Sequence, residues 1–251
     1  MSTPTTPRAK IRLYVPAPYA PGAEVPLAPE QAHYLANVMR QKPGDTVGVF
    51  NGADGEWSAE IATLTRKGGT VRLLAQTGPH RAPPDVWLLF APLKKARTDF
   101  VAQKATEMGA GLIQPVMTKR TIADRLKLDR LAANTVEAAE QCGLTALPQV
   151  REPETLDRLL DGWDASRKLL FCDEAGQGAA PILTALAGRP RGEPWAILIG
   201  PEGGFDPAEA ARLRALPFVV PVTLGPRIMR ADTAAIAALG VWQAVLGDWE
   251  G

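Results

Sequence analysis

The sequence predicts an α/β protein in which a small β-barrel precedes a parallel sheet. Short apolar segments at close spacing fill residues 11–76, whereas apolar segments alternate with helical patterns from residue 86 onwards. Between these regions, Pro79, Pro83 and Pro84 interrupt any periodicity, which is typical of a linker. Short strands between turns favour a barrel, and strand–helix alternation favours a parallel sheet covered by helices. We therefore expect domains at residues 1–78 and 79–251.

The N-terminal region carries four patterns of strand type, separated by turn clusters at residues 51–55 and 68–69. These strands are expected at residues 11–15, 46–50, 57–64 and 70–76. Residues 29–39 place apolar side chains at helical spacing, so one helix is expected to decorate the barrel.

The C-terminal region predicts strands at residues 86–92, 112–117, 169–172, 196–200 and 218–224, and helices near residues 98–108 and 128–142. Gly109 and Gly143 follow these helices as left-handed C-caps would. Asp206 and Glu209 flank a proline in the pattern of a capping box, which predicts a further helix start.

Composition excludes several classes of protein. The chain has 251 residues, 46% of them hydrophobic, and a formal net charge of +1, so no bulk positive field attracts nucleic acid and any RNA contact must be a local patch. Two cysteines and two histidines at unrelated positions predict neither a disulfide framework nor a metal site. The polar N-terminus and the lack of a long apolar run predict a cytoplasmic protein that does not enter a membrane.

The strongest local pattern is LIGPEGGF at residues 198–205, where an apolar strand runs into a glycine-rich turn. Gly200, Gly203 and Gly204 allow positive φ and a close approach of the backbone to a ligand. Ligands bind at this end of strands in parallel sheets. The turn lacks the lysine of the phosphate loop GxxxxGKS/T, and an ordinary tight turn explains it equally well.

A second turn of this kind, LGPRIMRADT, follows at residues 224–233. Arg227 and Arg230 stand where a helix is expected to begin, although cations are disfavoured at a helix N-terminus. An anionic partner such as an RNA phosphate would explain them. The spacing alone slightly favours a solvated helix start, with Asp232 or Thr233 as the cap.

Taken together, these motifs resemble the 16S ribosomal RNA (uracil-N3)-methyltransferases, the ribosomal small subunit methyltransferase E family of the SPOUT superfamily. The resemblance runs nearly end to end and depends on the joint order of several motifs. They are HYLANVMR at 33–40, residues 44–50, QKATEMG at 103–109, EAAEQCG at 137–143, and the two glycine turns. The family often has arginines after EAAEQCG, where Leu144 and Leu147 stand here, which puts one RNA or interface contact in doubt.

The resemblance implies a PUA-like N-terminal barrel, a SPOUT domain with a deep C-terminal trefoil knot, and a homodimer. It implies that S-adenosylmethionine (SAM) binds in the knot, and that the substrate is 16S rRNA, with the small ribosomal subunit as its context. The cofactor-binding residues that it implies are Phe171, Cys172, Ile199, Gly200, Pro201, Glu202, Gly203, Leu224, Gly225, Ile228 and Met229.

Methylation at N3 of uracil needs a proton acceptor and stabilisation of negative charge. We assign the second task to Arg230, with Arg12 or Arg120 helping to place the nucleotide, and Asp232 or water as the proton acceptor. A helix-capping role remains the commoner one for Asp232. Further residues expected to contact RNA are Arg227 and, in the N-terminal domain, His33, Arg40, Lys42, Arg66 and Lys67.

Three other functions stay open. Another SPOUT reaction, such as 2′-O-ribose methylation, would use the same cofactor fold. A non-catalytic RNA-binding protein of ribosome assembly would keep the barrel and lose the cofactor. A nucleotide-binding α/β domain is weakened by the missing lysine and the lack of GxGxxG.

Overall fold

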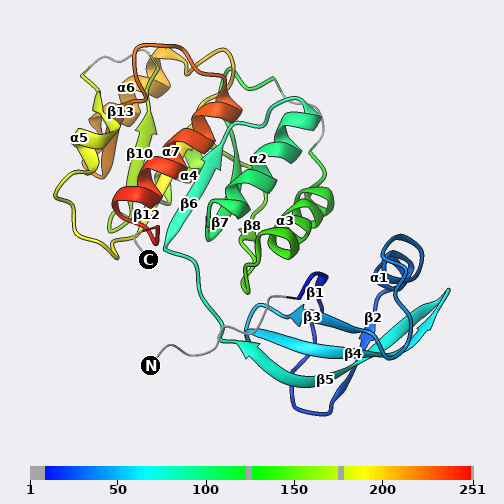
Figure 1. Ribbon diagram of the computed structural model, residues 1–251. Coiled ribbons are helices and arrows are strands. Elements are labelled where there is room, and N and C mark those ends of the chain that lie inside the picture. The colour runs from blue at the N-terminus through cyan, green and yellow to red at the C-terminus, as the bar shows by residue number, and fades with distance from the viewer. Residues whose placement is uncertain (1–8, 123–125, 175–177, 250–251) are drawn as a thin grey trace. The chain divides into compact units, whose positions relative to one another are not determined.

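The computed structural model describes residues 9–122, 126–174 and 178–249, and it divides into two compact units (Figure 1). The first unit comprises residues 1–82 together with 139–147, and the second comprises 83–138 together with 148–251. The N-terminal unit is therefore discontinuous in the sequence. It includes the last residues of a helix whose first residues belong to the second unit.

A five-stranded sheet in the order β1-β3-β4-β5-β2 forms the N-terminal unit. Its elements are β1 (Arg12–Tyr14), β2 (Glu24–Leu27), α1 (Pro29–His33), a π-helical turn (Tyr34–Val38), β3 (Thr46–Phe50), β4 (Glu56–Thr65) and β5 (Gly68–Gly78). The pair β1–β3 is parallel and the other pairs are antiparallel. All four expected strands are confirmed within a few residues, and β2 is an additional edge strand.

Arg12 is the main polar feature of this unit's interior, because only 6% of the residue is exposed. Its Nε donates to Glu56 Oε2 at 2.9 Å, and the guanidinium lies 4.7 Å from the centre of the Phe50 ring. The two terminal nitrogens donate to carbonyl oxygens of Ala139, Glu140 and Leu144 at 2.7–2.9 Å. A buried cation is tolerated only with such partners, so Arg12 ties residues 139–147 to the N-terminal sheet.

The second unit is a parallel sheet in the order β11-β13-β10-β12-β6-β7-β8, with β9 paired to β7. Its strands are β6 (Val86–Phe90), β7 (Leu112–Met117), β8 (Gln149–Val150), β9 (Glu154–Thr155), β10 (Lys168–Cys172), β11 (Ala180–Pro181), β12 (Trp195–Ile199) and β13 (Val219–Thr223). Its helices are α2 (Lys95–Glu107), α3 (Leu128–Cys142), α4 (Leu156–Asp161), α5 (Ile182–Leu186), α6 (Pro207–Ala215) and α7 (Ala231–Val245). The predicted α/β class is confirmed.

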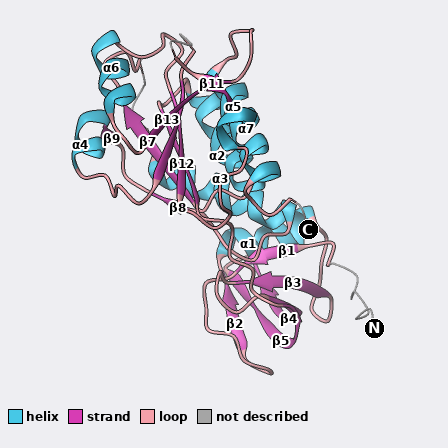
Figure 2. Cartoon of the chain, turned by 90° about the vertical axis from the view of Figure 1, so that its left-hand side faces the viewer, coloured by secondary structure: helices cyan, strands magenta, loops and turns pink. Residues whose placement is uncertain are grey.

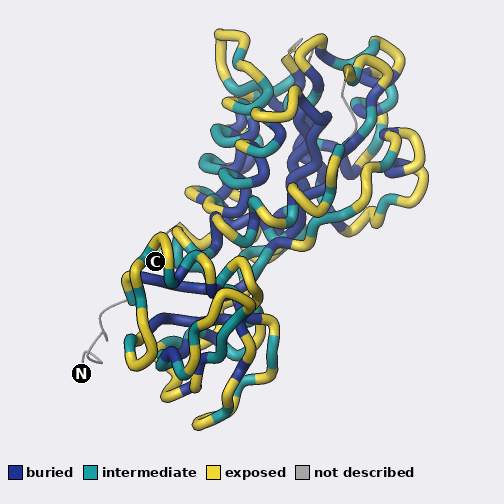
Figure 3. Tube along the Cα trace, turned by 90° about the vertical axis from the view of Figure 1, so that its right-hand side faces the viewer, coloured by how far each residue is buried: buried dark blue, intermediate teal, exposed yellow. Residues whose placement is uncertain are grey.

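Helices cover both faces of this sheet, with α4 and α6 on one side and α2, α5 and α7 on the other (Figure 2). Side chains of β12 alternate between these two cores: Ile197 packs on the α7 side and Leu198 on the α6 side. Such alternation is the period of a strand, and burying each leucine or isoleucine contributes about 1.5–3 kcal/mol. Consequently the central strands are buried along their length (Figure 3).

Candidate functional site

The segment at residues 200–205, which we call the glycine loop, joins β12 to α6. A Cβ on Gly200 would lie 2.5 Å from the Phe205 ring, and Gly204 has a φ of +66°. A side chain at either position would therefore force a rearrangement. The loop ends at Asp206, whose carboxylate accepts from the Ala208 amide at 2.9 Å, and Glu209 completes the expected capping box.

Three contacts hold the glycine loop from outside. Arg97 of α2 pairs with Glu202, and Arg120 donates to the carbonyl oxygen of Gly203 at 3.1 Å. The Phe205 ring packs edge-on against Phe171 of β10, with 5.0 Å between centroids. Ion pair, hydrogen bond and aromatic contact come from three separate elements, so the loop has a fixed shape before any ligand arrives.

The segment at residues 224–230, which we call the arginine turn, joins β13 to α7. Its hydrogen bonds to described residues are local: the Thr223 side chain bonds to Gly225, and the carbonyl oxygen of Arg230 accepts from the Ala234 amide at 2.8 Å. Ile228 is 87% exposed. The guanidinium groups of Arg227 and Arg230 have no hydrogen bond or ion pair with any residue that the structure describes. Both cations are thus available to a partner outside the chain.

The start of α7 differs from the expected capped helix. Arg230 occupies the N-cap position and provides no side-chain cap. Asp232 lies inside the first turn, where its carboxylate accepts from the Thr233 amide at 2.9 Å, and it also lies 3.7 Å from Nε of Arg97. Because no side chain caps the helix at Arg230, the first backbone amides of α7 would favour an anion.

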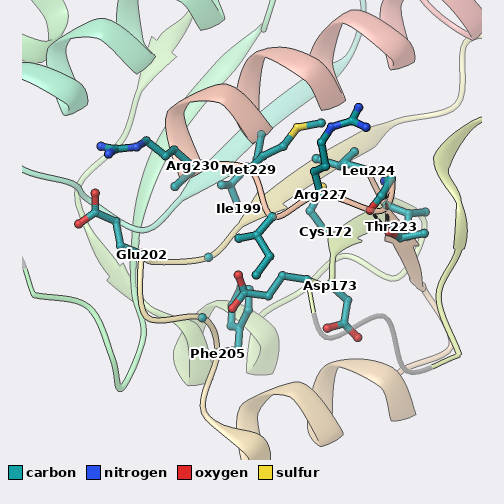
Figure 4. Close-up of a pocket in the computed structure, with 18 of the residues that line it drawn as sticks. Cys172, Asp173, Ile199, Glu202, Phe205, Thr223, Leu224, Arg227, Met229 and Arg230 are labelled. Carbon is teal, nitrogen blue, oxygen red and sulfur yellow. Dashed lines mark hydrogen bonds between the residues drawn. The ribbon is translucent and has the colours of Figure 1, made fainter.

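The glycine loop and the arginine turn enclose a cavity of about 290 Å³ (Figure 4). It lies at the carboxyl ends of β10, β12 and β13, where parallel sheets bind ligands. Its walls include every residue that the resemblance assigned to the cofactor except Phe171, which is fully buried, and Gly203, which is exposed. Those lining residues are Cys172, Ile199, Gly200, Pro201, Glu202, Leu224, Gly225, Ile228 and Met229. Arg227 and Arg230 also line it.

Acidic side chains that the sequence did not single out add to this wall. Asp173 and Glu174 line the cavity, and Asp173 is 4% exposed and paired with Arg214 of α6 at 2.8 Å. Burial raises the pKa of the neighbouring Cys172 to about 12, so that side chain is a neutral thiol at neutral pH. The cavity therefore presents carboxylates on one wall and, on the other, two arginines that have no partner among the described residues.

The remaining site predictions have different outcomes. Arg12, expected beside the nucleotide, is an interior residue of the N-terminal unit, as described above, and does not line the cavity. His33, Arg40 and Lys42 follow one another along α1 and the loop after it, and all three are exposed. Arg40 is unusual because its φ is +54° although it is not glycine. Arg66 and Lys67 are exposed in the hairpin turn between β4 and β5.

Arg97 and Arg214 were missed by the sequence reasoning. Each lies on a helix far along the chain from the carboxylate that it holds, so no local motif identifies it. Within residues 9–122, 126–174 and 178–249, no cluster of three potential metal-ligating side chains occurs. The same residues include no helix that is long and apolar enough to span a membrane.

Comparisons with known proteins agree with this geometry. Residues 80–243 match the RNA methyltransferase domain family, and residues 27–74 match the RNA methyltransferase PUA domain family. The ribosomal RNA small subunit methyltransferase E of Synechocystis is 34% identical over 89% of this chain and 74% of its own length. That of Rickettsia conorii is 28% identical over 91% and 93%.

Solved structures are similar over almost the whole chain. A Legionella pneumophila protein solved with bound SAM has a TM-score of 0.82 and 30% identity, covering 95% of this chain and 98% of that one. The Neisseria gonorrhoeae ribosomal RNA small subunit methyltransferase E bound to S-adenosyl methionine has a TM-score of 0.83 and 27% identity, covering 95% and 99%. By its fold, its two strand-end loops and these relatives, the chain belongs to the ribosomal RNA small subunit methyltransferase E family.

Proposed function

We propose that this protein transfers the methyl group of SAM to N3 of a uridine in 16S rRNA of the small ribosomal subunit. The observation that carries the proposal is the cavity at the strand ends. It has a rigid glycine loop on one side and, on the other, two arginines that pair with none of the described residues. The relatives solved with SAM support the choice of cofactor.

The residues of the cavity fit SAM in shape and charge. Gly200 brings the loop backbone against the cavity without a side chain, and the apolar Ile199, Leu224 and Met229 suit an adenine ring. Asp173, Glu174 and Glu202 suit the positively charged sulfonium and ammonium groups. When bound, SAM supplies a methyl group on a positively charged sulfur, ready for attack by a nucleophile.

Arg230 carries the main catalytic task in this proposal. As the N3 proton leaves, negative charge spreads over the two uracil carbonyl oxygens, and the unpaired guanidinium stabilises it. N3 forms its bond to the methyl carbon while the carbon–sulfur bond breaks, leaving a neutral thioether. The proton passes to water or to Asp232, which follows Arg230 in the first turn of α7.

RNA contacts come from separate groups of cations. Arg227 is assigned to phosphates near the target, and His33, Arg40, Lys42, Arg66 and Lys67 to phosphates along the N-terminal unit. Arg120 is assigned to holding Gly203, with its exposed part available to RNA. Arg12 is given a structural role, because its guanidinium is buried among carbonyl oxygens.

The finer architecture belongs to the same proposal: a PUA-like barrel at residues 1–78, a SPOUT domain at 79–251 with a trefoil knot, and a cytoplasmic homodimer. The knot rests on the family resemblance, and the sheet, in which β10 lies between β12 and β13, is compatible with the SPOUT domain. Ile236 and Val241 of α7 are only half-buried in the single chain, which supports a dimer. Light scattering in solution tests the dimer directly.

The deciding experiment measures methyl transfer from labelled SAM to small ribosomal subunits from a strain that lacks the enzyme, followed by nucleoside analysis. We expect 3-methyluridine, formed about 10²–10³-fold more slowly with Arg230→Ala. A 2′-O-methylated product would support the cofactor site but show that the ribose, and not the base, is the methyl acceptor. SAM binding without any transfer would instead favour a non-catalytic RNA-binding role.

A further inference from the structure

A second, smaller cavity lies between the beginnings of α2 and α3 in the same unit. Its volume is about 120 Å³. The residues that line it are Leu93, Lys95, Thr98, Asp99, Leu126, Lys127, Arg130 and Leu131. None of them was singled out by the sequence, and none lines the cofactor cavity.

The unpaired polar groups at this cavity are cations. Asp99 is already satisfied, because Arg130 donates to it at 2.8 Å and Asn134 at 3.0 Å. The Thr98 hydroxyl is used by the backbone of Leu93 at 2.9 Å. Lys95 and Lys127 are exposed and form no ion pair with any other residue that the structure describes. Counting the described residues that line it, the cavity thus has a net positive rim on which Lys95 and Lys127 are not neutralised.

The positions of these lysines add to the positive potential. Lys95 is the first residue of α2 and follows Lys94, which occupies the N-cap position without a side-chain cap. Lys127 precedes α3, and its carbonyl accepts from the Leu131 amide at 3.1 Å. Side chains with oxygen are preferred at such positions, and cations are disfavoured there unless an anion is bound.

Behind the rim the cavity is apolar. Leu131 is 1% exposed, Leu93 is 6% exposed, and Leu126 is half-buried beside them. A phosphate alone would not use this surface, whereas a nucleotide has both an anionic phosphate and a flat, largely apolar base. The combination of a positive rim and an apolar interior therefore matches the chemistry of one nucleotide.

We propose that this cavity binds a nucleotide of the RNA substrate next to the target, with its phosphate on Lys95 and Lys127 and its base against the leucines. The inference rests on the proposed function. The first turn of α2 links the two cavities, since Lys95 lines this one and Arg97 holds Glu202 at the other. An RNA whose target base lies in the cofactor cavity would then also be held at the smaller cavity.

The test measures binding of ribosomal RNA as a function of salt for the full-length protein and its Lys95→Ala and Lys127→Ala variants. We expect each variant to bind more weakly and to lower the slope of log affinity against log salt by about 0.7–1, the value for one phosphate contact. SAM affinity should stay at the wild-type value. Lys168→Ala is the matched control, because Lys168 starts β10 at the opposite end of the sheet.

Leu126→Trp tests the base itself, since it narrows the cavity and leaves every cation in place. We expect weaker RNA binding with an unchanged salt slope. Wild-type slopes in both lysine variants would overturn the phosphate contact, and wild-type affinity in Leu126→Trp would overturn the base contact. Either failure alongside normal methyl transfer by the wild type would reject this subsite and leave the proposed function standing.

Discussion

The two segments that enclose the cofactor cavity are built in opposite ways. The glycine loop is held by Arg97, Arg120 and Phe171 from three separate elements. The arginine turn has only local hydrogen bonds, and both of its arginines are without partners among the described residues. Both follow a strand of the parallel sheet and precede a helix, so the difference lies in their tertiary contacts rather than in their local pattern.

This difference indicates a division of labour. A loop fixed in advance binds its ligand without an ordering cost, which suits a cofactor that is used in every turnover. A turn with unpaired cations is completed only when an anionic ligand arrives, which suits the substrate. Arg230→Ala and Gly200→Ala each change one side of this comparison and should leave the other unaffected, whereas Arg97→Ala also removes the cation near Asp232.

Arg230→Ala should have the largest effect. Removing the group that stabilises the developing uracil anion is expected to lower kcat by about 10²–10³-fold, as for the loss of a single oxyanion donor. The affinity for SAM, measured by calorimetry, should be unchanged because the glycine loop is intact. Arg227→Ala is the matched control, and it should weaken RNA binding more than it lowers kcat. Normal turnover in Arg230→Ala would refute the catalytic assignment.

Gly200→Ala should disturb the glycine loop. Its Cβ would meet the Phe205 ring at 2.5 Å, so the ring must leave its contact with Phe171. We expect a loss of about 1–3 kcal/mol in the free energy of unfolding, measured in urea, together with weaker SAM binding. Gly203→Ala is the control, because its Cβ would meet only the Arg120 Cβ, at 4.0 Å. Equal stability of the two variants would argue against a preformed loop.

Arg97→Ala should have a smaller effect. The ion pair with Glu202 is partly exposed, so stability should fall by less than about 1 kcal/mol. SAM affinity should fall by about threefold to tenfold, since Glu202 lines the cavity. Arg97→Lys keeps the charge and should recover part of the loss. Arg212→Ala removes two partly exposed ion pairs between α6 and α4 and should leave SAM binding intact. Weaker SAM binding in this variant would mean that the effect of Arg97→Ala is not local.

The smallest expected effect concerns Cys172, between the two segments. Its pKa of about 12 lies above the ordinary value of 9, so at pH 8 the thiol should react with iodoacetamide far more slowly in the folded protein than in urea. Below pH 9 the thiol is protonated in both the folded and the unfolded protein, so it does not affect stability. Above pH 9 the free energy of unfolding falls, because the thiol ionises in the unfolded protein and stays protonated in the folded one. Mass spectrometry reads the labelling, and fast labelling of the folded protein would show an open cavity wall.

Local signals accounted for much of the fold. The capping box at Asp206 and the glycine caps at Gly109 and Gly143 were predictable because each depends on residues a few positions apart. Strand β2 was missed because Pro26 argues against a strand, and it is tolerated there because β2 pairs on one side only. The capping role expected for Asp232 was wrong, since α7 begins earlier than that pattern indicated.

The sequence predicted the two turns of the site, but not which side chains hold them in place. That Arg97 would hold Glu202, or that Arg12 would be buried, depends on contacts across more than a hundred residues of chain. The chemistry at N3 of uracil came from the family resemblance, because no residue pattern by itself distinguishes a base from a ribose as the methyl acceptor. Only the product nucleoside can do so.

The buried guanidinium of Arg12 has a practical consequence for dissecting the molecule. A fragment that stops at residue 82 would lack the carbonyl oxygens of Ala139, Glu140 and Leu144. Its interior cation would lose most of its acceptors, at a cost of about 3–5 kcal/mol, a large share of the stability of a small domain. The N-terminal unit is thus formed by two separate segments of the chain. The smallest form that would keep it intact is a circularly permuted or fused chain that also carries residues 139–147.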